Sequence, residues 1–140
     1  MALIALGLNH LTAPLELRER VAFAPDATPL ALSDLSRQPG VNEAMILSTC
    51  NRTELYVDVD KGAEAVPQRW LSEQHRLTER RIDEFLYRHD DADAVRHLFR
   101  VATGLAPMRV SVRTRLATAK VCCSRRSIGA RRLPALRAAW

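Results

Sequence analysis

The sequence is poor in the residues that mark several classes of protein. It has three cysteines, two of them adjacent, which form no disulfide framework and are typical of a reducing cytosol. No apolar run approaches the length of a membrane span, and the first eight residues lack the basic flank of a signal peptide. Its glycines form no Gly-x-Gly-x-x-Gly motif, and its histidines have no metal-ligand spacing. We therefore expect a cytoplasmic protein without a membrane segment, a bound metal or a dinucleotide-binding loop of its own.

Acidic residues are absent from position 109 onward. That segment holds nine of the 21 Lys and Arg residues and none of the 16 Asp and Glu residues, so residues 1–108 carry a net charge of −4 although the chain carries +5. Residues 109–140 show no clean period of 3.6 or 2 residues, which predicts an irregular, disordered basic tail. A short nucleic-acid arm is an alternative, because arginine without acid attracts phosphate. An amphipathic membrane helix is disfavoured by Pro134 and by the lack of an apolar stripe.

Residues 1–108 alternate between strand and helix patterns. The apolar run 3–8 predicts a strand, and a short helix follows, with Thr12 as a possible cap and Pro14 in its first turn. The later patterns predict a helix at about 29–37, strands at 44–47 and 53–59, a helix at 63–75, a strand at 82–87, and a last helix opened by Asp90 and Asp91 with the apolar set Ala94, Val95, Leu98, Phe99, Ala102 and Leu105. This order predicts an α+β domain, with a small antiparallel, ferredoxin-like sheet and helices on one of its faces.

A cysteine stands at the predicted turn between two of these strands. Thr49, Cys50, Asn51 and Arg52 place a hydroxyl, a thiol, an amide and a guanidinium side by side. A thiol at the tip of a hairpin, beside an arginine, is accessible and prone to ionise. A small apolar core residue is the ordinary interpretation of a lone cysteine, but such a residue is seldom flanked by Thr, Asn and Arg.

Four sequence blocks then resemble one family, glutamyl-tRNA reductase, in order and in spacing. The blocks are Gly7-Leu-Asn-His-Leu-Thr-Ala-Pro14, Leu17-Arg-Glu-Arg-Val-Ala-Phe23, Ile46-Leu-Ser-Thr-Cys-Asn-Arg-Thr-Glu-Leu-Tyr56 and Ala94-Val-Arg-His-Leu-Phe-Arg-Val-Ala-Thr-Gly-Leu105. The resemblance covers residues 1–108 and implies the catalytic amino-terminal domain of that family. It implies a reaction in which glutamate esterified to its tRNA is reduced with NADPH to glutamate-1-semialdehyde, the entry to tetrapyrrole (porphyrin) synthesis. In the family a separate Rossmann-type domain carries NADPH, and a helical domain makes the homodimer.

The resemblance also implies roles for individual residues. Cys50 would be the nucleophile that forms a thioester with the glutamyl group, and Thr49, Asn51 and Arg52 would bind that group. Arg52 offers a bidentate fork for the γ-carboxylate. His97 would assist proton transfer near the thiol. The alternatives are an ordinary solvated turn arginine for Arg52 and a helix-surface histidine without a role for His97.

The resemblance ends near residue 108. Pro107 stands where the family has a serine, and the Gly-Glu pair that follows in the family is missing. A reading-frame shift in a GC-rich gene would produce such an arginine-rich tail, and we state this as a hypothesis. Without an NADPH domain or a dimer domain, we expect the chain to bind no NADPH and to be unable to complete the reduction. A non-enzymatic fragment or a protein- or RNA-binding module is the alternative function.

Overall fold

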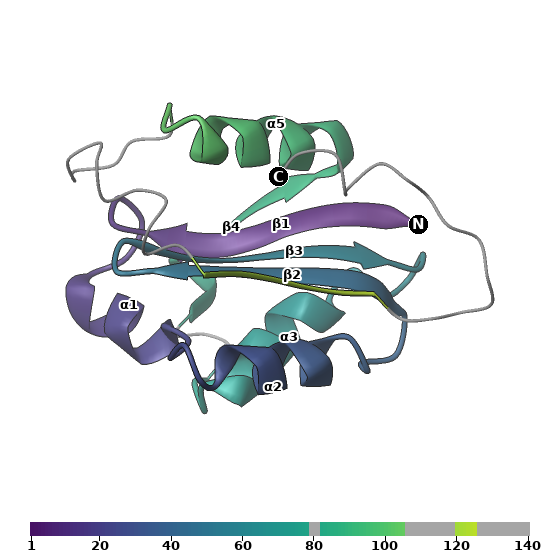
Figure 1. Ribbon diagram of the computed structural model, residues 1–140, viewed down its shortest axis with the longest axis horizontal. Coiled ribbons are helices and arrows are strands. Elements are labelled where there is room, and N and C mark those ends of the chain that lie inside the picture. Colours follow the sequence, from purple (N-terminus) through teal and green to yellow (C-terminus); the bar gives the residue numbers. More distant parts are fainter. Residues whose placement is uncertain (79–81, 106–119, 126–140) are drawn as a thin grey trace.

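The computed structural model describes residues 1–78 and 82–105 and the backbone of residues 120–125. Figure 1 shows the elements along the chain. They are β1 (Ala2–Asn9), α1 (Leu15–Val21), α2 (Thr28–Leu35), β2 (Val41–Thr49), β3 (Arg52–Val59), α3 (Val66–Gln74), β4 (Tyr87–Asp90), α5 (Asp91–Ala102) and β5 (Lys120–Arg125).

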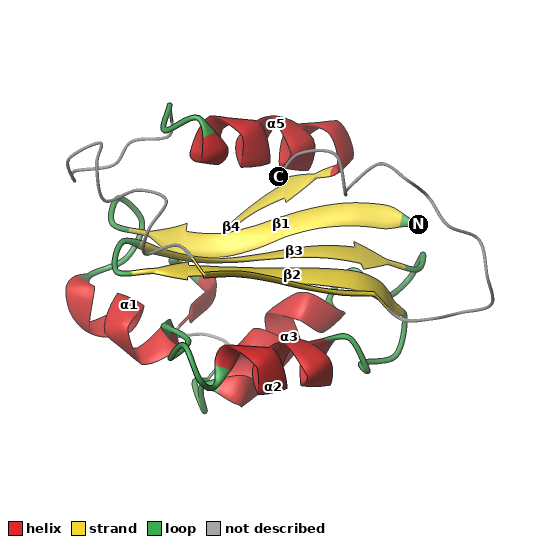
Figure 2. Cartoon of the chain, in the orientation of Figure 1, coloured by secondary structure: helices red, strands yellow, loops and turns green. Residues whose placement is uncertain are grey.

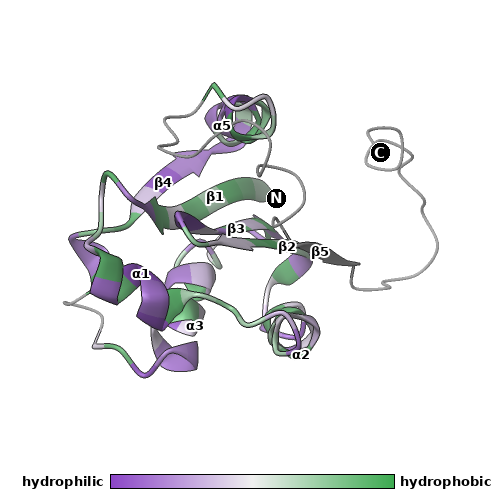
Figure 3. Cartoon of the chain, turned by 60° about the vertical axis from the view of Figure 1, so that its left-hand side comes forward, coloured by the Kyte–Doolittle hydropathy of each residue, from purple (hydrophilic) through white to green (hydrophobic). Residues whose placement is uncertain are grey.

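Neighbouring strands of the sheet are antiparallel throughout, in the order β4-β1-β3-β2-β5. Figure 2 labels β4, β1, β3 and β2, and Figure 3 labels β5 beside β2. Because β3 lies between β1 and β2 and runs antiparallel to both, β1 and β2 run parallel to each other with one strand between them. This is the split βαβ arrangement of ferredoxin-like domains. The predicted α+β class with an antiparallel sheet is confirmed.

The two faces of the sheet are covered by different helices. Leu55, Val57 and Val59 of β3 join the large apolar cluster that also holds buried residues of α1, α2 and α3. Tyr56 points to the other face and joins a smaller cluster with Ala94 of α5. Figures 1 and 3 show the sheet between α5 and the layer of α1, α2 and α3. The expectation of helices on one face holds for α1, α2 and α3, whereas α5 covers the opposite face.

The strand predicted at 82–87 is wrong over most of its length. Ile82 and Asp83 are helical, and the backbone amides of Phe85 and Leu86 donate to the carbonyl of Ile82 at 2.9 and 3.2 Å. The apolar residues at 82, 85 and 86 therefore follow helical spacing and pack on the large cluster. The strand, β4, begins only at Tyr87, and it is a short polar edge strand.

Two further predictions differ in detail from the structure. Thr12 does not cap α1, whose N-cap is Pro14. The Thr12 hydroxyl instead accepts the backbone N–H of Asn9 at 3.0 Å and closes the turn after β1. In α5, Ala94 is buried, but Val95 and Phe99 are 41% and 64% exposed, because the helix packs on the sheet along Ala94, Leu98 and Val101.

Part of the tail that was predicted to be irregular forms a strand. β5 pairs with β2 from Glu43 opposite Arg125 to Ser48 opposite Lys120. The outer edge of β2 presents unpaired backbone donors and acceptors, and β5 satisfies them. The other tail residues, 106–119 and 126–140, lie outside the described residues, so the division at residue 108 stays a prediction.

Candidate functional site

The hairpin between β2 and β3 presents Cys50 to solvent. Thr49 pairs with Arg52, so the connection is the two-residue turn Cys50–Asn51. The Thr49 hydroxyl accepts the backbone N–H groups of Asn51 and Arg52, both at 3.2 Å, and so closes the turn with its own side chain. Cys50 is a free, exposed cysteine. The predicted accessible thiol at the bend is therefore what the structure contains.

Both carbonyls of this turn are held by neighbouring segments. The backbone N–H of His10 donates to the Asn51 carbonyl at 3.0 Å. Arg18, from α1, donates through Nη1 to the Cys50 carbonyl at 2.9 Å. The backbone beneath Cys50 is thus fixed from the end of β1 and from α1. No local sequence pattern predicts this contact of Arg18, because the approach of α1 to the hairpin arises only in three dimensions.

Arg52 is buried beside the turn and is only partly satisfied. Its side chain is 1% exposed, and its Nη1 lies 2.8 Å from Oε1 of Glu54. Nε and Nη2 are also buried and meet no hydrogen-bond partner among the described residues. A buried unsatisfied donor costs about 1–3 kcal/mol. Two such donors on one planar group form a fork that matches a carboxylate. Arg52 is therefore not the ordinary solvated turn residue that was the alternative.

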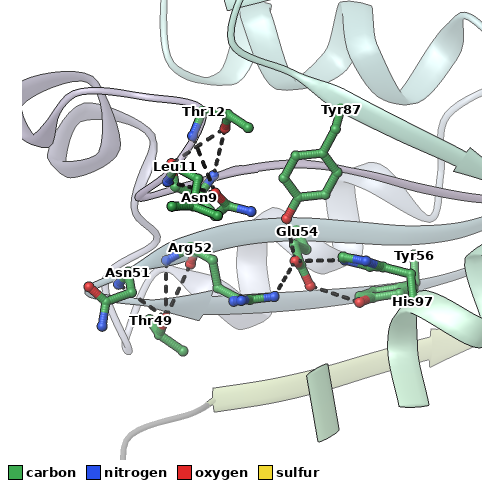
Figure 4. A network of polar contacts seen from close by, with 10 residues as sticks. All are labelled: Asn9, Leu11, Thr12, Thr49, Asn51, Arg52, Glu54, Tyr56, Tyr87 and His97. Atoms are coloured by element: carbon green, nitrogen blue, oxygen red, sulfur yellow. Dashed lines mark hydrogen bonds and ion pairs between the residues drawn. The ribbon is translucent and has the colours of Figure 1, made fainter. Parts of the chain in front are cut away.

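Glu54 is the centre of the polar network in Figure 4. Its Oε1 faces Nη1 of Arg52 at 2.8 Å and Nε2 of His97 at 3.0 Å, and it also accepts the Tyr87 hydroxyl. Its Oε2 accepts the hydroxyl of Tyr56 at 2.7 Å. Strands β3 and β4 and helix α5 thus converge on one carboxylate, which is 1% exposed.

A glycine in β1 makes room for this carboxylate. Gly7 lies opposite Glu54 in the sheet register. A Cβ atom on Gly7 would lie 2.4 Å from the Thr53 carbonyl oxygen and 2.8 Å from Cγ of Glu54, both far inside van der Waals contact. The close approach of side chain and strand at this point requires a residue without Cβ.

The network favours the ionised form of Glu54. Burial by itself raises the pKa of a carboxyl group, but the hydrogen bond from His97, the charge of Arg52 and the two tyrosine hydroxyls together hold the pKa of Glu54 below its ordinary value. Burial and the nearby Glu54 carboxylate raise the pKa of Tyr56 and of Tyr87. Both tyrosines therefore remain hydroxyl donors at any ordinary pH.

His97 reaches the network from α5. Its side chain is 15% exposed, and its ring stacks on His89 at a centroid distance of 4.5 Å and meets Tyr87 edge-on at 5.3 Å. The pKa of His89 is lowered by burial and then by the charge of His97. His97 is therefore not a surface histidine, because its side chain is largely buried and bonded to Glu54, and its role stays a prediction.

The five residues singled out from the sequence fall into two connected groups. Thr49, Cys50 and Asn51 form the hairpin turn, while His97 lies on Glu54. Figure 4 shows Thr49 and Asn51 at one end of the network and His97 at the other, with the Arg52 side chain between them. The proximity of His97 to the thiol stays a prediction.

Glu54, Tyr56 and Tyr87 were not among the predicted site residues. A usable signal was present: Arg52, Glu54 and Tyr56 alternate along β3, so the strand period places a cation, an anion and a hydroxyl on one face. Tyr87 could not have been found this way, because its segment was assigned to the wrong strand boundaries.

No group of three or more His, Cys, Asp or Glu side chains in the described part of the chain could hold a metal ion. Within the same residues, no helix has both the length and the hydropathy to cross a membrane.

The fold and the site define a split βαβ domain that carries an exposed hairpin cysteine beside a buried Arg–Glu–His cluster. Residues 6–111 match the family model described as glutamyl-tRNAGlu reductase, N-terminal domain. The match covers most of the chain, and the chain belongs to this family.

Individual relatives agree with the family model. The chain is 52% identical over 108 residues to the glutamyl-tRNA reductase of Marinobacter nauticus and 51% identical over 105 residues to that of Alkalilimnicola ehrlichii, matches that cover 77% and 75% of this chain. They cover only 25% and 24% of the relatives, so the chain spans about a quarter of their length. The solved glutamyl-tRNA reductase of Methanopyrus kandleri is similar in fold, with a TM-score of 0.54 and 28% identity over 76% of this chain and 23% of that one.

Proposed function

We propose that this chain performs the acyl-transfer step of glutamyl-tRNA reduction, with Cys50 as the nucleophile. The Cys50 sulfur forms a bond to the glutamyl carbonyl carbon, the ester bond to the ribose oxygen breaks, and the thiol proton passes to that oxygen. A glutamyl thioester and free tRNA result. An ester of this kind is an activated acyl group, so a thiolate attacks it readily. The relatives are named for glutamyl-tRNA as their substrate, and the proposal transfers that substrate to this chain.

The observation that carries the proposal is an exposed thiol at Cys50 together with a buried arginine, two residues along the chain, whose hydrogen-bond donors are only partly satisfied. Nε and Nη2 of Arg52 lack partners among the described residues, whereas Nη1 is occupied by Glu54. A γ-carboxylate bound at this fork would satisfy both donors and fix the glutamyl group beside Cys50. Thr49 and Asn51 flank Cys50 in the hairpin turn, and we assign their hydroxyl and amide to the reacting carbonyl.

His97 is assigned to proton transfer. Its Nε2 is held on Glu54, which leaves Nδ1 as the nitrogen that can exchange a proton. Glu54 fixes the orientation of the ring, as a carboxylate does for the histidine of other nucleophilic sites.

The NADPH of the family does not fit the residues described. A dinucleotide phosphate needs a glycine-rich loop at a helix N-terminus. Among the described residues, Gly7 instead packs within the sheet against Thr53, and Gly40, Gly62 and Gly104 lie singly in turns with φ of 78°, 92° and 72°. We therefore derive no hydride step for these residues, and the proposal ends at the thioester.

Incubation of the full chain with glutamyl-tRNA, followed by intact-mass and peptide mass spectrometry, tests the proposal. We expect one glutamyl adduct on Cys50 and none in Cys50→Ser. Absence of an adduct on the folded wild-type chain would refute the acyl-transfer step. Retention of tRNA by both proteins without any adduct would favour the non-enzymatic binding module instead.

A second comparison isolates Arg52. Arg52→Lys keeps the charge but loses the fork, and we expect acylation to slow by about 10-fold to 100-fold, the equivalent of one charge-assisted hydrogen bond. The matched substrate control is glutaminyl-tRNA, because the glutamine side chain has the same length as that of glutamate but ends in an amide in place of the γ-carboxylate. Equal acylation by the two aminoacyl-tRNAs would show that Arg52 does not read the carboxylate.

A further inference from the structure

Arg52 and His97 are held by the same oxygen atom, Oε1 of Glu54. The two contacts measure 2.8 and 3.0 Å, and all three side chains are at least four-fifths buried. We propose that Glu54 is a positioning residue that couples them, so that a carboxylate bound to Arg52 makes His97 take up a proton more readily. The inference rests on the proposed function in one respect, since it takes the fork of Arg52 as a carboxylate site.

The coupling follows from the charges around Oε1. In the free chain the positive charge of Arg52 compensates Glu54, and His97 meets a partly neutralised carboxylate. A second carboxylate on Nε and Nη2 takes up part of the Arg52 charge and adds a negative charge close by. Glu54 then attracts the Nε2–H of His97 more strongly, which favours uptake of a second proton by the ring at Nδ1. Because the groups are buried, solvent and salt screen these interactions only weakly.

The other groups that face His97 do not take its place in this scheme. Tyr56 of β3 and Tyr87 of β4 remain protonated, since their pKa values are raised. His89 of β4 has its pKa lowered by burial and by the charge of His97, so it resists a second proton. On α5 itself, Asp93 pairs with Arg96 at the exposed surface. The proton that responds to occupancy of Arg52 is therefore the one on His97.

Glu54 donates no proton in this scheme and touches no substrate atom. Its role is to orient Arg52 and His97 and to transmit the charge of one to the other. The same role couples proton transfer to substrate binding. His97 would be in its proton-donating form while the γ-carboxylate is bound to Arg52, and the ribose oxygen leaves in that state.

The test uses the full chain and two small probes that cannot acylate Cys50 as an ester can. L-Isoglutamine carries a free γ-carboxylate and an α-amide, and L-glutaminamide replaces that carboxylate by a second amide. Nitrogen-15 NMR follows the Arg52 Nε–H signal and the two ring nitrogens of His97 near pH 6.5. We expect isoglutamine to shift the Arg52 signal and to move the ring nitrogens of His97 toward the imidazolium values, and glutaminamide to do neither.

Two variants locate the coupling. In Glu54→Gln, isoglutamine should still shift Arg52 but leave the protonation of His97 unchanged. Tyr56→Phe is the matched control, because it removes a hydrogen bond from Oε2 and leaves the charge and the Oε1 contacts in place, so the His97 response should persist. Reciprocity requires isoglutamine to bind more tightly when His97 is protonated, by the same factor by which isoglutamine favours that protonation, and we expect about fivefold or more.

The outcomes separate the inference from the proposed function. If isoglutamine shifts Arg52 while His97 does not respond in the wild-type chain, the coupling is overturned and the carboxylate site stands. If isoglutamine shifts neither residue, the carboxylate site fails and the coupling fails with it. This wild-type comparison of the two probes needs no variant, so it decides the matter even if Glu54→Gln does not fold.

Discussion

Replacing Glu54 by Gln tests the buried network directly, because the change removes one negative charge and preserves the shape of the side chain. Arg52 would remain charged and buried without its counter-charge. The new amide would also present a donor to one of the groups that now donate to Glu54. Removal of one partner from a buried ion pair costs about 3–5 kcal/mol. Since domains of this size are stable by about 5–15 kcal/mol, the variant should lose about a fifth or more of its free energy of unfolding.

Urea unfolding followed by circular dichroism measures this loss, provided that the m-value is the same in both proteins. Arg96→Gln is the matched control, because it breaks an ion pair at the surface. The side chains of Arg96 and Asp93, which form this pair, are 70% and 64% exposed. That change should cost no more than about 0.5 kcal/mol. A loss below about 1 kcal/mol for Glu54→Gln, similar to an exposed pair, would refute the reasoning that Glu54 and Arg52 form a desolvated unit.

The same network predicts a pH dependence with a defined sign. The pKa of Glu54 is lower in the folded chain than in the unfolded chain, because the donors around it outweigh the effect of burial. Its stabilising contribution is therefore complete above the ordinary glutamate value and is lost as the pH falls below it, from about pH 5 downward. Acid titration of the urea midpoint should be steeper for the wild-type chain than for Glu54→Gln in this range. Equal slopes would contradict the assignment.

Three further predictions concern other parts of the fold. Gly7→Ala should destabilise the chain by about 2 kcal/mol or more, because the new methyl group would lie 2.4 Å from the Thr53 carbonyl oxygen. Thermal unfolding measures this loss, and an unchanged unfolding midpoint would show that β1 can move aside. Trp70→Phe should lower the free energy of unfolding in urea by about 2 kcal/mol, because the buried indole donates to Oδ2 of Asp34 at 2.6 Å. Asp34→Asn keeps an acceptor and should cost less. A larger loss for Asp34→Asn than for Trp70→Phe would contradict this. Burial lowers the pKa of His75, so the unfolded chain binds this proton at higher pH than the folded chain, and stability should fall as the pH drops through about 6.5. His75→Gln should reduce that fall, measured as urea midpoints on either side of this pH.

The hairpin cysteine was predictable because its determinants are local. Turn-forming side chains at 48–52 and the strand alternation at 53–59 lie close together in the chain and follow from residue type and period. The structure shortens the predicted connection to the two-residue turn Cys50–Asn51, because Ser48, Thr49 and Arg52 join the paired strands. The prediction of a strand at 82–87 was wrong because local pattern alone did not decide it. Its apolar residues fit either period over so short a span, and packing against the large cluster selected the helical one.

The sequence by itself determined which face each residue of β3 occupies, where the thiol is exposed and which family the four blocks resemble. The tertiary structure decided that α5 crosses to the second face of the sheet and that His97 and Tyr87 reach the carboxylate of Glu54. The physical reason is the range of the interactions. Turn chemistry and side-chain alternation act between residues a few positions apart, whereas the contact of His97 with Glu54 joins residues 43 positions apart and exists only once the sheet has formed.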